Sequence, residues 1–166
     1  MDNLRYEQNL PPNISLRPFT LADEAFLYEL YASTRQEEMA HTGWDEAQQE
    51  AFLKMQFYAQ HSYYMATFAD AAFDIVLQGE TPIGRLYVHR RPDELRIVDV
   101  ALLPAYRGRG IGGGLLQAIL AEAAAAGLAV RLHVETFNPA RHLYQRLGFQ
   151  EVGGTDVHRL LEWRAA

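Results

Sequence analysis

Five glycines within seven positions, Gly108 to Gly114, constrain this 166-residue chain more than any other feature. They lie between an apolar run that ends at Leu103 and a stretch with helical periodicity. Glycine permits a tight turn and leaves no side chain over the amide groups, so successive N–H groups can converge at a helix N-terminus. The helix dipole favours an anion there. The segment therefore predicts a strand–turn–helix unit that binds a phosphate or a pyrophosphate.

The same glycines also match a dinucleotide-binding pattern, Gly108-x-Gly110-x-x-Gly113, with Glu135 downstream at a distance suited to a ribose. That pattern normally opens a doubly wound sheet, whereas only 31 residues follow Glu135. The connection from Pro104 onward is also longer than the tight dinucleotide turn. An NAD-dependent oxidoreductase is therefore the weaker alternative, which a fluorescence titration with NAD would test.

Alternation and turn residues predict the elements of the first part of the chain. Strands are expected at Ile14–Phe19, Tyr63–Phe68, Phe73–Gln78, Ile83–Arg90 and Leu95–Leu103. Helices are expected after Thr20, where a capping box with Asp23 begins, and from Asp45 to about Gln60. The expected helix faces carry Phe26, Leu27, Leu30 and Tyr31 in the first helix and Ala51, Phe52, Met55 and Ala59 in the second.

The second part changes to alternating strands and helices. A helix is expected over about Gly110–Ala126, ended by Gly127, and a second from an Asn138-Pro139 start to Gly148. Strands are expected at Val130–Glu135 and Val157–Trp163. Antiparallel strands followed by a βαβ unit predict one α/β domain over residues 1–166, with a mixed, mostly antiparallel sheet and flanking helices.

Composition excludes several classes of protein. The absence of cysteine excludes a disulfide framework, an iron–sulfur site and a cysteine nucleophile. A net charge of −6 argues against non-specific nucleic-acid binding. No metal site is expected, because the histidines show no ligand spacing. No apolar run is long enough to span a membrane, and Met1–Arg5 does not resemble a signal peptide, so a cytoplasmic protein is expected.

Two motifs and an N-terminal segment resemble the GNAT superfamily of acyl-CoA-dependent N-acyltransferases. Arg107-x-x-Gly110-x-Gly112, after the strand that ends at Pro104, resembles the pyrophosphate-binding motif of that superfamily. The run from Asn138 through Tyr144 to Phe149 resembles its second signature. The first strand and helix, Ile14 to Asp23, are similar to its usual start. The two motifs cover residues 98–149.

The resemblance implies a donor site for acetyl-CoA. The strands at Leu95–Leu103 and Val130–Glu135 would run parallel but splay apart, with the pantetheine arm of acetyl-CoA between them. It would bond to backbone groups of Ala101, Leu102 and Leu103. The backbone amides of the glycine-rich turn would hold the pyrophosphate, with Arg107 and Arg109 at its rim; these amides are those of Gly108, Arg109, Gly110, Ile111, Gly112 and Gly113. Asn138 would contact pantetheine or cap the following helix.

The implied reaction is direct acetyl transfer to an amine, without an acyl-enzyme. Tyr144 matches the tyrosine that protonates the departing sulfur in many relatives, and it would also contact the cofactor. Relatives often place a base at positions matching Arg96 and Val98, where neither residue can serve. Asp99 is excluded because alternation turns it to the opposite face. The candidates are then His133, Glu135 or a water relay.

The acceptor is expected to be a small-molecule or protein amine. The stretch Ser33–Asp45 would shape its pocket with Arg35, Glu37, Glu38, His41, Trp44 and Asp45. A non-catalytic acyl-CoA-binding module is the alternative in another class. The chain is expected to be a monomer or a homodimer.

Overall fold

The strands pair into one seven-stranded sheet in the order β1-β2-β3-β4-β5-β7-β6. The computed structural model describes residues 9–166, so Met1–Arg5, on which the signal-peptide prediction rests, lies outside the described residues. The strands are β1 (Ile14–Pro18), β2 (Ala72–Gln78), β3 (Thr81–Arg90), β4 (Glu94–Leu102), β5 (Ala129–Glu135), β6 (Gln150–Gly154) and β7 (His158–Trp163). Among the strands of residues 9–166, only β4 and β5 pair in parallel, and the other neighbours are antiparallel.

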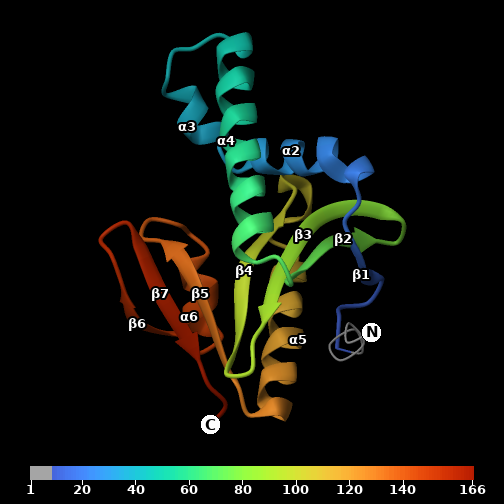
Figure 1. Ribbon diagram of the computed structural model, residues 1–166, viewed down its shortest axis with the longest axis vertical. Helices are drawn as coiled ribbons and strands as arrows, with labels where there is room; N and C mark the ends of the chain where they lie inside the picture. Colours follow the sequence, from blue (N-terminus) through green and yellow to red (C-terminus); the bar gives the residue numbers. More distant parts are fainter. Residues whose placement is uncertain (1–8) are drawn as a thin grey trace.

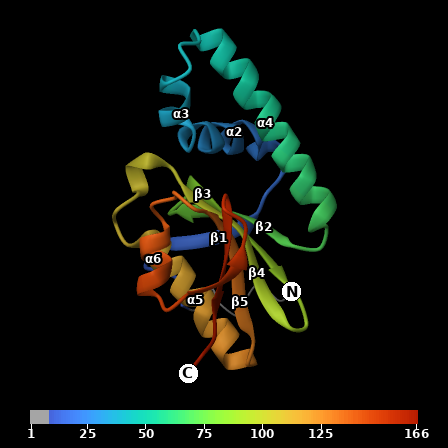
Figure 2. The same cartoon turned by 90° about the vertical axis from the view of Figure 1, so that its left-hand side faces the viewer.

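Helices cover both faces of the sheet (Figure 1). They are η1 (Leu21–Asp23), α2 (Glu24–Ser33), α3 (Gln36–Ala40), α4 (Glu46–Thr67), η2 (Pro104–Tyr106), α5 (Ile111–Ala126) and α6 (Arg141–Arg146). Helix α4 crosses in front of β4, and α5 lies behind the strands (Figure 1). In the turned view, α2, α3 and α4 gather at one end of the molecule, above α5 and α6 (Figure 2).

Two hydrophobic cores follow from this arrangement. The larger one packs the apolar face of α5, including the fully buried Leu115 and Ile119, against the sheet. The smaller one joins α2, α3 and α4 to β2 through Leu27, Phe57 and Ile75. The expected α/β domain with a mixed, mostly antiparallel sheet is confirmed.

The parallel pair β4–β5 separates part-way along its length. Paired positions run from Glu94 and Ala129 to Ile97 and Leu132 and stop there. The two strands lie side by side at one end and diverge toward the other, below α3 and α2 (Figure 1). The predicted splay is therefore present, and the later residues of β4 have no strand partner on that side.

Helix α4 is where the sequence prediction was wrong. Tyr63–Phe68, expected as a strand, continues α4 to Thr67, and Phe68 caps its end. The buried face of α4 carries Leu53 and Phe57, whereas Met55 is 63% exposed. The expected face of Ala51, Phe52, Met55 and Ala59 is therefore rotated from the buried one. The aromatic residues favour strand locally, but they pack beside the sheet, and tertiary packing overrides that preference.

The C-terminal elements differ in smaller ways. Helix α6 covers only Arg141–Arg146, because Pro139 and Ala140 form a turn before it. Strand β6 and the short helix α3 were not predicted. Their segments, Gln150–Gly154 and Gln36–Ala40, are short, and β6 is exposed throughout, so neither carries a clear apolar period. Within residues 9–166, no helix is long and apolar enough to cross a membrane.

Candidate active site

The glycine-rich turn joins the end of β4 to the start of α5. Gly108 and Gly110 have positive φ angles of 72° and 81°, a conformation that glycine adopts without strain. Gly110 is the N-cap of α5, and the first intrahelical bond runs from the Gly114 N–H to the Gly110 carbonyl. The amides that precede Gly114 in the first turn have no helical partner. They form an end of α5 that is suited to an anion.

The surroundings of these glycines differ from one position to the next. A Cβ built on Gly108 or Gly110 would meet no atom within 4 Å, and one on Gly112 only Leu102 at 3.9 Å. Protein packing therefore leaves the turn open on that side. Gly114 differs, because its Cβ would lie 2.4 Å from the ring of Pro11. Gly108, Gly110 and Gly112 therefore leave the helix end accessible, whereas Gly114 allows the close approach of Pro11.

The two arginines of the turn are held by the protein. Arg107 donates from Nε to the Leu102 carbonyl at 2.9 Å and from Nη2 to Ser33 Oγ at 3.3 Å. It therefore ties the end of β4 to α2. Arg109 lies over the ring of Tyr106, with its guanidinium carbon 5.7 Å from the ring centre.

Tyr144 lies on α6 and is buried, with 7% of its surface exposed. Its ring makes an edge contact with Phe149, at 5.6 Å between centroids. Burial, together with the negative charge of Asp99, raises the pKa of the Tyr144 phenol to about 12. The phenol is therefore protonated at neutral pH and can donate a proton.

Asp99 lies on the same face of the sheet as Arg96, although two-residue alternation predicts the opposite face. The register between β3 and β4 pairs Tyr87 with Asp99 but Val88 with Ile97, so Val98 is an extra residue in a β-bulge. One extra residue reverses the alternation after it. Ile97 packs in the α5 core, and Asp99 bonds to Tyr64 of α4 on the other face. The prediction that Asp99 points away from the face of Arg96 is wrong for this reason.

Asp99 belongs to a polar cluster just beyond Ile97, the last residue of β4 that pairs with β5. Its Oδ2 accepts from Arg85 Nη2 at 2.5 Å and from the Tyr64 hydroxyl at 3.2 Å. Arg85 also donates to Gln60 Oε1 at 3.0 Å. Sequence analysis missed this cluster, although one signal was present. Asp99 is the only charged residue in the apolar run from Ile97 to Pro104.

His133 lies on β5, on the same face. Its Nδ1 accepts from Arg96 Nη1 at 3.0 Å, so its ring proton is on Nε2. Partial burial lowers the pKa of His133, and the positive charge of Arg96 and the nearby His158 lower it further. The nitrogen that could take a proton is therefore already occupied by a guanidinium.

Glu135, at the end of β5, faces α2 and α3 across the gap. Its Oε1 lies 3.6 Å from Arg35 Nη1, and the same Arg35 nitrogen donates to Glu38 at 2.8 Å. The Glu135 side chain is 49% exposed. Arg35 therefore joins Glu135 on β5 and Glu38 on α3 in one ion-pair network.

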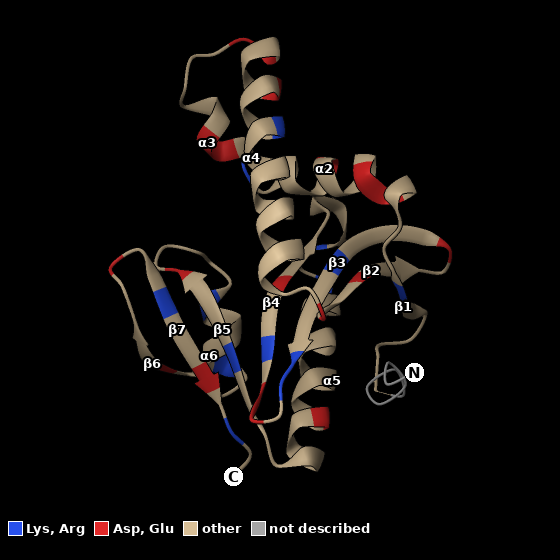
Figure 3. Cartoon of the chain, in the orientation of Figure 1, with Lys and Arg blue, Asp and Glu red and all other residues tan. Residues whose placement is uncertain are grey.

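The remaining predicted residues have local roles. Asn138 Oδ1 accepts from the Ala140 N–H at 2.9 Å, so Asn138 caps the turn before α6 and keeps its side-chain NH₂ for another partner. Asp45 caps α4 by accepting from the Gln48 N–H, and Trp44 packs edge-on against Phe52. Acidic residues lie on α3 and at the upper ends of β5 and of the β6–β7 turn (Figure 3).

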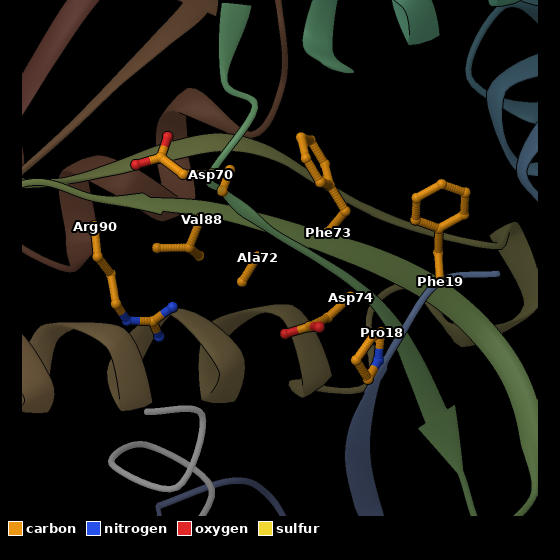
Figure 4. A pocket seen from close by; sticks show the side chains of 9 residues that line it. Pro18, Phe19, Asp70, Ala72, Phe73, Asp74, Val88 and Arg90 are labelled. Atoms are coloured by element: carbon orange, nitrogen blue, oxygen red, sulfur yellow. The ribbon is translucent and has the colours of Figure 1, made fainter. Parts of the chain in front are cut away.

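A separate pocket lies at the other end of the sheet, between β1, β2 and β3 (Figure 4). It is lined by Pro18, Phe19, Asp70, Ala71, Ala72, Phe73, Asp74, Val88 and Arg90. None of the predicted site residues lines it, so it does not coincide with the gap between β4 and β5.

Two solved structures share this fold. The PaiA N-acetyltransferase of Thermoplasma acidophilum, in complex with coenzyme A, is 19% identical, with a TM-score of 0.67 over 92% of this chain and 99% of that one. The ribosomal alpha-N-protein acetyltransferase RimL is 15% identical, with a TM-score of 0.65 over 94% of this chain and 92% of that one.

Sequence similarity points in the same direction. The ribosomal protein bS18-alanine N-acetyltransferase of Haemophilus influenzae is 38% identical over 61 residues, which are 36% of this chain and 42% of that protein. The chain spans less than half of the length of the curated relatives it matches. The model of the acetyltransferase (GNAT) family matches residues 25–149, which include both motifs and the cluster at Asp99. The chain therefore belongs to the GNAT family of acetyltransferases.

Proposed function

We propose that this chain transfers an acetyl group from acetyl-CoA directly to a primary amine. The observation that carries the proposal is the open glycine-rich turn at the start of α5, next to the part of β4 that no longer pairs with β5. Asp99 on β4 and the buried phenol of Tyr144 on α6 are the candidate proton-transfer groups. The carboxylate can accept a proton, and the phenol can donate one. Amide formation from an amine and a thioester needs both of these groups.

The glycine-rich turn and the end of β4 would hold the donor. The open amides from Gly108 to Gly113 suit its pyrophosphate. Arg109 lies within the same turn, so its guanidinium would add positive charge beside the pyrophosphate. Backbone groups of Ala101, Leu102 and Leu103 lie on the part of β4 that has no strand partner toward β5. Arg107 supports this segment through its bond to Leu102, and the Asn138 side-chain NH₂ is available from the facing turn.

Acetyl-CoA, the donor of this family, supplies the acetyl group as a thioester. Asp99 then takes the proton that the acceptor amine must lose, and Tyr144 protonates the sulfur as it leaves. We assign the base to Asp99 in place of His133 or Glu135. The one ring nitrogen of His133 that could accept a proton is bonded to Arg96. Asp99 and Glu135 are each paired with an arginine through one oxygen, but Asp99 is fixed by two donors, whereas Glu135 is half exposed at the end of β5. The chain has no cysteine to form an acyl-enzyme through a thiol, which is consistent with direct transfer.

The acceptor is a small-molecule amine or the amine of a protein. The names of bS18-alanine N-acetyltransferase and of RimL support a protein α-amine as the first class to test. Glu37 and Glu38 on α3 are exposed near the gap, and Glu135 is half exposed. These carboxylates would attract a cationic amine.

The test is turnover with acetyl-CoA and a panel of amines that includes peptide N-termini and polyamines, followed by the release of free thiol. Tyr144→Phe and Asp99→Asn should each lower kcat by about 100-fold, because each removes one proton-transfer group. Tyr63→Phe, an exposed substitution on α4, is the matched control and should leave kcat unchanged.

Two results would contradict the proposal. Tight binding of acetyl-CoA without turnover across the panel would point to a binding module. A variant with Asp99→Asn and full activity would remove Asp99 from the chemistry and return the role of base to His133 or Glu135.

A further inference from the structure

Arg85 is a buried cation in the middle of the sheet. It lies on β3, its side chain is only 5% exposed, and it carries a full charge beside the α4 layer. Burying a guanidinium costs several kcal/mol unless it is paired and hydrogen-bonded. Its partners are Asp99, Gln60 and the face of Tyr87, whose ring centre lies 5.1 Å from the guanidinium carbon. Arg85 Nε is buried without a partner among the described residues.

All the bonds to Asp99 converge on one of its two oxygens. Arg85 and Tyr64 both donate to Oδ2, from two different elements, β3 and α4. Two donors of fixed direction on one oxygen fix the rotamer of the carboxylate. The second oxygen, Oδ1, has no donor among the side chains and backbone groups of residues 9–166. It is therefore the atom that remains for an acceptor amine.

We propose that Arg85 is a positioning residue, which together with Tyr64 holds the Asp99 carboxylate by Oδ2 so that Oδ1 can take the proton from the amine. The proposal rests on the role of Asp99 stated above. Arg85 acts through Asp99 and need not touch either substrate. Gln60 and Tyr64 add a link to α4, which packs on α2, so the carboxylate is also fixed relative to the helical layer on the acceptor side.

The alternative is that Arg85 only neutralises a buried charge and stabilises the fold. The two roles make different kinetic predictions. A structural role predicts a loss of folded protein and of acetyl-CoA affinity. A positioning role predicts a loss of kcat in folded enzyme with unchanged acetyl-CoA affinity, because misplacement of a reacting group by about 1 Å costs rate. It also predicts that the loss disappears when Asp99 itself is absent.

The test is a double-mutant cycle on the full chain with Arg85→Met, Asp99→Asn and the double variant. Acetyl-CoA affinity by calorimetry and melting temperature are measured on each. Arg85→Met should lower kcat by about 10-fold to 100-fold. The double variant should lie within about threefold of Asp99→Asn alone, because coupled residues are not additive. Arg85→Lys keeps the positive charge but lacks the planar set of guanidinium donors, so its kcat should lie between those of Arg85→Met and wild type.

If Arg85→Met does not fold, Tyr64→Phe tests the same proposal, because Tyr64 is the other donor to Asp99 Oδ2. It removes a single hydroxyl and should lower kcat severalfold, whereas Tyr63→Phe, its exposed neighbour, should not. The inference is overturned if Asp99→Asn is inactive while Arg85→Met and Tyr64→Phe keep kcat within about twofold of wild type. Independent, additive losses in the cycle also overturn it. A fully active Asp99→Asn variant instead refutes the assignment of the base.

Discussion

The carboxylate of Asp23 holds the first strand to the first helix. It accepts from Arg17 Nη1 at 2.7 Å and from Arg17 Nη2 at 2.8 Å, and also from the Thr20 N–H at 2.8 Å. These bonds, Arg17 first, lower the pKa of Asp23 to about 2. The pair fixes where α2 starts relative to β1.

Asp23→Asn should lower the free energy of unfolding by about 1 kcal/mol at pH 7, because one charged partner of Arg17 is lost. Since the pKa of the folded state is below that of the unfolded state, this stabilisation is present above about pH 4 and is lost as the pH falls toward 2. Urea unfolding at several pH values measures the difference between the two proteins. A difference that does not shrink below pH 4 would contradict the assignment. Glu50→Gln, in an exposed pair with Lys54, is the control and should cause no measurable change.

At the scale of single residues, the sequence predicts which side chains are candidates for the site, but it does not predict toward which face of the sheet each side chain points. Tyr144 was placed in the site by the motif around it, and it lies in α6 as expected. Asp99 was rejected because two-residue alternation was assumed along β4. The bulge at Val98 arises from the pairing with β3, a strand distant in sequence, so nothing local in the sequence announces it.

At the scale of elements, the glycine-rich turn and helix α5 form the element on which the proposed donor binding would depend. Gly112 and Gly114 both lie in the first turns of α5, but their surroundings differ. Gly112 has room for a side chain, and Gly114 is packed against Pro11. A substitution at Gly112 is therefore expected to affect donor binding, whereas a substitution at Gly114 is expected to affect stability.

Gly112→Asp should weaken acetyl-CoA binding by at least about 100-fold while the fold stays intact. A carboxylate in the first turn stabilises the helix itself through the dipole, but it repels the pyrophosphate and covers the amides. Calorimetry measures the affinity, and unchanged affinity would refute the assigned position of the pyrophosphate. Gly114→Ala is the matched variant, which should lower the melting temperature because its Cβ clashes with Pro11. Gly110 is less suitable, because its positive φ strains any replacement.

Helix α4 is the element whose start could be predicted from the sequence but whose end could not. Its start at Asp45 is predicted from the sequence, and in the structure Asp45 forms a capping box with Gln48. Its length is not predicted, because Tyr63, Tyr64 and Phe68 favour strand by residue type. In the structure these rings contact one another and Tyr87 along the side of the sheet. Tyr64 reaches Asp99 only because the helix continues this far.

At the scale of the whole molecule, the proposed donor site lies between β4 and β5, whose paired positions end at Ile97 and Leu132. The gap between β4 and β5 separates the first strands from β5, α6 and β7. A ligand held by β4, α5 and the turn at Asn138 would bridge the two sides. Binding to the folded state alone stabilises it in proportion to the logarithm of ligand concentration.

Acetyl-CoA at 100 times its Kd should raise the free energy of unfolding by about 2.7 kcal/mol. For a chain of this size, that corresponds to a rise in melting temperature of roughly 5 to 10 °C. A thermal melt with and without ligand measures it. NAD at the same concentration should give no shift, and a larger shift with NAD would revive the dinucleotide hypothesis. Gly112→Asp should abolish the shift with acetyl-CoA.

The sequence by itself determined the strand–turn–helix unit, the order of most elements, and the placement of the glycine-rich turn before α5 and of Tyr144 in the last helix. These features depend on contacts within a few residues, such as caps, turns and periodicity. Only the tertiary structure decided the face of Asp99, the pairing of His133 with Arg96 and the burial of Arg85 beneath α4. Each of these depends on register between strands or on a helix packed across them. Such contacts join residues far apart in the chain, and local pattern carries no information about them.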